Sequence, residues 1–201
     1  SGLLATNATR GNVTVNVAQT LSLRFVDSSV SFGAGYVNTT GSSSNCSLTT
    51  VVGDTNNGCI DFDDDTTAFI IENIGNTNST IVMNTNASAV EFIGVGDAGF
   101  AWNVTENEAG SCYNTSKAVN SESTVSPNTS SGCGAGDTDA TEACGTIFEN
   151  VSVSPKVICP RLLNNLSNSL RIDVNITIPF DAPAGEKGAY INVTATADPL
   201  T

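Results

Sequence analysis

The sequence has no histidine and few positively charged residues. Seven lysines and arginines stand against twenty aspartates and glutamates, so the formal net charge of the 201 residues is −13. The absence of histidine excludes every mechanism that uses an imidazole as a base, a proton shuttle or a metal ligand. The shortage of cations argues against a nucleic-acid partner, because neutralising phosphates needs lysine and arginine. It also argues against binding to anionic membrane surfaces.

Long apolar runs are missing as well. No run reaches the ~18 residues that a membrane-spanning helix needs, so we expect no membrane insertion. Only 13% of the residues are charged, and uncharged polar residues take their place: 23 Asn, 22 Ser and 25 Thr. The length is sufficient for one domain with a sizeable core.

Catalytic motifs are also absent, and we expect that the protein is not an enzyme. The serines have no histidine partner, and neither S-x-x-K nor G-x-S-x-G occurs. Carboxylate pairs of the kind that glycosidases use stand in no recognisable motif, and aromatic residues are too few to line a sugar-binding cleft.

One acidic cluster has a spacing that is typical of calcium ligands. Asp61, Asp63 and Asp65 form D-x-D-x-D, and Glu72 stands eleven residues after Asp61, as in an EF-hand loop. Thr66 replaces the glycine of that loop and strand-like sequence follows, which argues against an EF-hand. A looser Ca²⁺ site and a solvated acidic loop are the two interpretations left open. We expect no other metal or organic cofactor.

Alternation of apolar and polar residues runs through most of the chain and predicts an all-β protein. The clearest strands are 170–178 and 189–197, and the pair 67–74 and 79–85, which residues 75–78 join as a hairpin loop. Shorter strands are expected at 30–33, 35–38, 89–93, 100–105 and 147–153. About eight to ten strands at these spacings predict a β-sandwich.

Two segments differ from the rest of this sandwich, which we place at residues 27–201. Residues 106–145 are rich in Ser, Thr, Gly and Asn and are expected to form a disulfide-tied surface insertion. Residues 1–26 contain an unusually long alternating strand that either bends near residues 18–20 or leaves the domain. Six of its large apolar residues share the odd positions: Val13, Val15, Val17, Leu21, Leu23 and Phe25.

The cysteines predict a disulfide-bonded, extracellular protein. There are six, none of them in a C-x-x-C pair, and an even number suits an oxidising compartment. The spacing does not settle the pairing. We favour short loops closed by Cys46–Cys59 and Cys133–Cys144, with Cys112–Cys159 anchoring the insertion. The start at Ser1 without an initiator methionine favours a chain secreted after removal of a signal peptide.

Sequons for N-linked glycosylation are more frequent than random placement of Asn, Ser and Thr predicts. Strand alternation also generates N-x-T, which explains some of them but not those in turn-like sequence. We expect glycans at several of the thirteen sites. They begin at Asn7, Asn12, Asn38, Asn45, Asn78, Asn86, Asn103, Asn114, Asn128, Asn150, Asn165, Asn175 and Asn192.

Three stretches resemble secreted archaeal surface proteins with Ig-like or jelly-roll folds. They are the hairpin I-E-N-I-G-N-T-N at residues 71–78, the turn D-A-P-A-G at 181–185, and the strand Y-I-N-V-T-A-T-A at 190–197. The same features are similar to those of TasA-like filament subunits, a group that includes archaeal bundling pilins. The resemblance implies a jelly-roll or Ig-like sandwich and polymerisation through an N-terminal strand donated to the next subunit.

Two functions follow as hypotheses. The first is a structural subunit of an extracellular, pilus-like filament, whose partners are copies of itself in a head-to-tail polymer. The six odd-numbered apolar residues from Val13 to Phe25 then fill a groove in the neighbouring subunit. The alternative is a glycosylated cell-surface or S-layer-associated adhesin that binds a surface glycan or a cell partner through the insertion.

Overall fold

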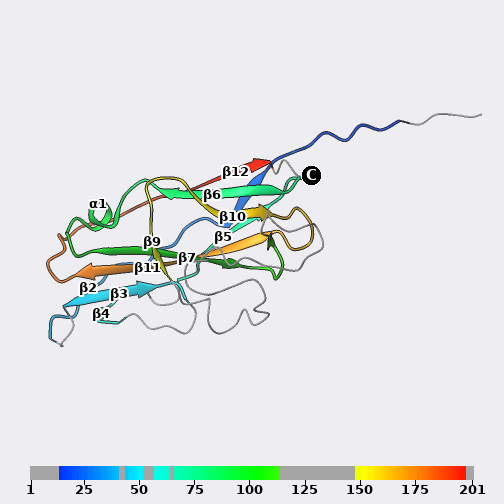
Figure 1. The fold of residues 1–201 in the computed structure, drawn as a ribbon. Helices are drawn as coiled ribbons and strands as arrows, with labels where there is room; N and C mark the ends of the chain where they lie inside the picture. The colour runs from blue at the N-terminus through cyan, green and yellow to red at the C-terminus, as the bar shows by residue number, and fades with distance from the viewer. Residues whose placement is uncertain (1–13, 41–43, 52–56, 64–65, 114–147, 198–201) are drawn as a thin grey trace, which may run out of the picture.

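The computed structural model confirms an all-β sandwich, and it describes residues 14–40, 44–51, 57–63, 66–113 and 148–197. Two antiparallel sheets lie face to face, and a short helix lies at one end (Figure 1). Among these residues, no helix is long and apolar enough to cross a membrane.

The larger sheet has six strands and the facing sheet has four. The larger contains β1 (Leu23–Asp27), β5 (Phe69–Asn73), β11 (Ser169–Pro179), β7 (Gly99–Glu106) and β9 (Glu149–Asn150), with β3 (Asn45–Thr49) also paired to β11. The smaller contains β12 (Ile191–Ala197), β6 (Ser79–Thr85), β10 (Lys156–Leu162) and β8 (Cys112–Tyr113). A separate pair is formed by β2 (Tyr36–Val37) and β4 (Cys59–Ile60), and the helix is α1 (Ala89–Ile93).

Strand β11 is the central strand of the larger sheet. Its first half pairs with β5, its second half pairs with β3, and β7 accompanies it from Leu170 to Thr177. Eleven residues at ~3.3 Å each give it a length of about 33 Å. It therefore marks two opposite ends of the sandwich, one at Ser169 and the other at Pro179.

The core divides into two clusters along β11. The first lies between the two sheets and is built from both of them, with Trp102 and Ile172 facing Ile81, Met83 and others. The second lies toward Pro179. Its buried members are Phe32, Cys46, Leu48, Ile93, Phe100, Val174 and Ile176. In the described part of the chain, none of these seven belongs to the four-stranded sheet. One end of the larger sheet thus extends beyond the strands that cover the other end.

Each cluster contains one disulfide. Cys112–Cys159 joins β8 to β10 in the first cluster, and Cys46–Cys59 joins β3 to β4 in the second. Both are pairs that the sequence favours. The expected pair Cys133–Cys144 lies outside the described residues, as does most of the expected insertion.

Several local predictions are wrong. Residues 89–93 form helix α1 instead of a strand, because Ser88 and Glu91 make a capping box. Residues 30–33 form no strand, whereas β3 and β10 are strands in segments where none was expected. The body also begins earlier than residue 27, since β1 pairs with β5 from Leu23 onward.

The first cluster should dominate stability. Ile81 is fully buried there, so Ile81→Ala should lower the free energy of unfolding by about 3 kcal/mol, through lost burial and the cavity left behind. Thr194→Ala, at an exposed position of the neighbouring strand, should change it by less than about 0.5 kcal/mol. Chemical denaturation of both variants provides the measurement. Equal effects would contradict this assignment of the core.

Candidate functional site

The N-terminal arm, residues 14–20, is exposed along its whole length. Val15 is 82% exposed and Val17 is 76% exposed. The arm leaves the sandwich at the end away from α1 and points into solvent (Figure 1). Two apolar side chains on one face of an extended segment are thus left in water, where their burial against another surface would be favourable.

Only part of the predicted donor strand belongs to this arm. Leu23 and Phe25 lie in β1 and pack against the first core cluster of their own molecule. Because their own sheet already pairs their backbone and half-buries their side chains, the structure places them in the body of their own molecule and not in the arm. Leu21, at the junction, is 40% exposed. Val13 lies outside the described residues, which leaves Val15 and Val17 as the described apolar residues of the arm.

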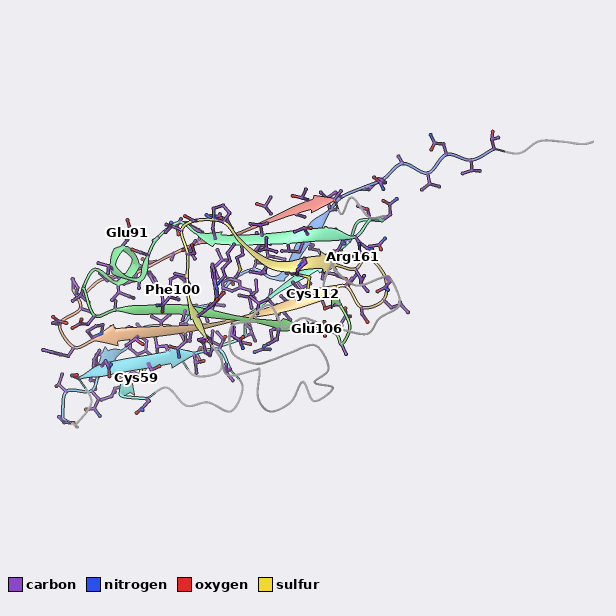
Figure 2. All side chains as sticks on the ribbon, in the orientation of Figure 1. Cys59, Glu91, Phe100, Glu106, Cys112 and Arg161 are labelled. Carbon is purple, nitrogen blue, oxygen red and sulfur yellow. A yellow bond between two sulfur atoms is a disulfide. The ribbon has the colours of Figure 1, made fainter. Side chains whose placement is uncertain are left out.

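A wide apolar groove of about 1020 Å³ lies at the other end of the molecule, over the second core cluster. Six of the eight phenylalanines of the chain line it, and Glu186 and Lys187 are its only charged lining residues within the described ranges. Its floor comes from strands of the six-stranded sheet: Leu48, Phe69, Phe100, Val174, Ile176 and Ile178. Figure 2 shows Phe100 and Glu91 toward this end, and Cys112, Glu106 and Arg161 toward the opposite end.

Two segments far apart in the sequence form the walls of the groove, and helix α1 adds Phe92 and Ile93. The first wall is residues 30–37, where the Phe32 carbonyl accepts a hydrogen bond from the Asp63 N–H at 2.9 Å. At Gly35 a Cβ atom would lie 2.4 Å from the Ile60 carbonyl oxygen, so only glycine allows this wall to lie so close to β4.

The second wall is the connection from β11 to β12, residues 179–191. Hydrogen bonds from its backbone N–H groups attach this connection to other segments near both of its ends. The Phe180 N–H donates to the Ser44 carbonyl at 3.0 Å, and the Tyr190 N–H donates to Asn86 Oδ1 at 2.6 Å. Phe180 is still 63% exposed although it lines the groove. This part of the apolar lining is therefore open to solvent.

The edge of the four-stranded sheet beside the groove is also unpaired. Among the described strands, β12 pairs with β6 alone, and its first residue, Ile191, lines the groove. At Ile191 the outer edge of β12 thus presents backbone N–H and C=O groups next to the apolar groove. Together these are the two features that a sheet needs to accept an additional strand.

A capping box holds α1 at the groove. Ser88 Oγ accepts a hydrogen bond from the Glu91 N–H, and the Glu91 carboxylate accepts one from the Ser88 N–H at 2.8 Å. The hydrogen bond from the Ser88 backbone holds the pKa of Glu91 below its ordinary value. Gly94, in the left-handed conformation with φ of 94°, ends the helix.

Asp61 and Asp63, predicted as possible calcium ligands, do not line the groove. Asp61 and Asp63 are exposed and Asp65 lies outside the described residues. Within the described part, no three acidic or cysteine side chains gather as a metal site.

The sequons differ in their exposure. Asn103, in the centre of β7, is only 1% exposed. Its prediction as a glycan carrier is wrong for this fold, because a buried side chain has no room for a sugar. Asn7, Asn12, Asn114 and Asn128 lie outside the described residues, and Asn38, Asn78 and Asn175 are half-buried. The exposed sites are Asn45, Asn86, Asn150, Asn165 and Asn192.

Comparison with protein-family models, with curated proteins and with solved structures found no match to this chain. The site is therefore defined by its geometry alone. The alternation of the N-terminal segment predicts the arm, whereas the groove escapes sequence analysis because its walls come from segments about 150 residues apart.

The capping box makes the helix at the groove sensitive to acid. Because folding lowers the pKa of Glu91, the stabilisation is complete above the ordinary value of 4.5 and is lost as the pH falls through the lowered value. Glu91→Gln should therefore be less stable than the wild type at pH 7 and should converge with it in acid. Thermal unfolding across this range provides the measurement, and a difference independent of pH would contradict the prediction.

Proposed function

We propose that this protein is a structural subunit of an extracellular filament, assembled when the arm of one copy enters the groove of the next. The observation that supports this most directly is the pairing of an exposed apolar arm at one end with an open apolar groove at the other. Because donor and acceptor lie on different parts of the surface, each added copy leaves one of each unused. Such a contact generates a linear chain instead of a closed dimer.

The dimensions of the groove suit this segment. From Val174 to Phe180, the β11 side of the groove spans six residue steps, or about 20 Å. A seven-residue strand has this length, and residues 12–18 place Val13, Val15 and Val17 on one face. In this arrangement the arm would lie along the groove next to the start of β12 at Ile191, while the valines cover the phenylalanine-rich floor.

Charge does not oppose the contact. The net charge of −13 comes from the residues after the arm, since Arg10, a positive charge, is the only charged side chain among residues 1–23. An uncharged strand enters an apolar groove without burying an unpaired charge. Full burial of each valine contributes about 1.5–3 kcal/mol, which favours association over an exposed arm.

An extracellular location is compatible with the two disulfides and with the polar, uncharged composition. The adhesin alternative places its binding site in residues 106–145, most of which lie outside the described part of the chain. The described residues instead provide an exposed arm and an open groove, so the filament is the function we propose. It requires no catalysis, and its partners are further copies of this chain.

Changing the arm should abolish assembly. Val15→Asp with Val17→Asp would bury two carboxylates in an apolar groove, so association should weaken by more than about 100-fold and leave folded monomers. Thr14→Asp with Asn16→Asp adds the same charge on the opposite face of the arm and should still form filaments. Size-exclusion chromatography and negative-stain electron microscopy distinguish the two. Filaments from the valine variant would refute the proposal.

The groove can be tested independently. Phe180→Asp places a charge at an exposed position of the groove and should also give monomers. This variant keeps its arm, whereas the valine variant keeps its groove. A mixture of the two should therefore form one-to-one dimers that cannot grow. A mixture that stays entirely monomeric would show that arm and groove do not bind each other.

We also propose that N-linked glycans occupy the exposed sequons, where they would limit unwanted edge-to-edge pairing of strands. Mass spectrometry of glycopeptides from native material should find sugar at one or more of Asn45, Asn86, Asn150, Asn165 and Asn192, and none at the buried Asn103. Sugar at Asn103 would contradict the fold as described.

A further inference from the structure

The turn between β5 and β6 holds the base of the arm. The Thr20 N–H donates to Asn76 Oδ1 at 2.6 Å, and the Asn76 N–H donates to the Thr20 carbonyl at 2.9 Å. Asn76 Nδ2 donates to the Ala18 carbonyl, also at 2.9 Å. One asparagine thus makes three hydrogen bonds to two residues of the arm, at the point where the arm leaves the sandwich.

Gly75 allows the arm to lie this close. A Cβ atom at Gly75 would stand 2.3 Å from the Thr20 carbonyl oxygen and 3.0 Å from the Ser22 backbone nitrogen. Both neighbours are backbone atoms, so they cannot rotate away as a flexible side chain would. Any larger residue at position 75 would displace the arm from the turn.

A buried asparagine keeps the turn itself in place. Asn73, which is 1% exposed, donates from Nδ2 to the Thr77 carbonyl at 2.9 Å and accepts the Gly75 N–H at Oδ1. Its backbone N–H donates to the Asn168 carbonyl at 2.9 Å, and Asn168 Nδ2 donates to the Asn73 carbonyl at 3.0 Å. The turn is therefore bound on its inner side to the body of the sandwich.

We propose that this Gly75–Asn76 corner is an anchor that fixes where the arm leaves the body and in which direction. Residues 18–20 are exposed, so hydrogen bonds rather than apolar burial hold them. The chain before Ala18 can then extend as a strand whose orientation is set by the body. The use of this orientation in assembly rests on the proposed filament function; the anchor itself is a property of the monomer.

The first test measures the anchor without any polymer. In the Phe180→Asp background, hydrogen exchange at the Thr20 amide should become about fivefold faster in Asn76→Ala, because one exposed hydrogen bond is lost. Asn76→Asp keeps an acceptor and should retain the protection, whereas Gly75→Ala should lose it. Asn107→Ala, which removes an exposed asparagine that binds Ser169, is the matched control and should leave Thr20 unchanged. Unchanged exchange in Asn76→Ala would overturn the anchor.

The second test measures orientation in the assembled filament. Filaments of Asn76→Ala should show a broader distribution of subunit-to-subunit angles in electron micrographs than filaments of the wild type or of Asn107→Ala. Equal distributions would overturn the orienting role. If the wild type formed no filaments, the proposed function would fail, yet exchange at Thr20 would still decide whether the anchor exists.

Discussion

The larger sheet of the sandwich is longer than the strands available to cover it, and the rest of the molecule depends on this mismatch. Trp102 and Ile172 face the four-stranded sheet and are enclosed by it. Phe100 and Ile176, only a few residues along the same strands, instead face a groove walled by loops and one short helix. The same pair of strands therefore contributes to an enclosed core at one end and, at the other, to an apolar surface that none of the described strands of the smaller sheet covers.

Each half of the core contains one disulfide, and the two disulfides close chain segments of different length. In the enclosed half, Cys112–Cys159 closes a span of 47 residues, for which the chain-entropy account gives about 4 kcal/mol. In the open half, Cys46–Cys59 closes 13 residues, for which the same account gives about 3 kcal/mol. The second disulfide ties β3 to β4, which supports the wall made by residues 30–37. The disulfide thus stabilises one wall of the groove.

The sequence predicts the parts of this structure that depend on local pattern. Alternation of apolar and polar residues correctly identifies β6, β11 and β12, and the polar residues 75–78 correctly place the turn between β5 and β6. It does not separate Val15 and Val17 from Leu23 and Phe25, because all four share one register. The point where the arm leaves the body is fixed by the turn between β5 and β6, more than fifty residues away in the sequence. A local sequence pattern cannot reveal a contact at this separation. Helix α1 has only five residues, too few to show a helical period, although Ser88 and Glu91 have the spacing of a capping box.

Strand β1 connects the N-terminal arm to the first wall of the groove within one continuous stretch of chain. It begins just after the anchored base of the arm, pairs antiparallel with β5, and continues into residues 30–37, which wall the groove. In a fibre built from these subunits, tension would enter each copy along the axis of β1. The β1–β5 ladder would then be loaded in shear, with its hydrogen bonds sharing the force together instead of breaking one after another. The place where the chain leaves the body thus also determines how the subunit resists being pulled apart.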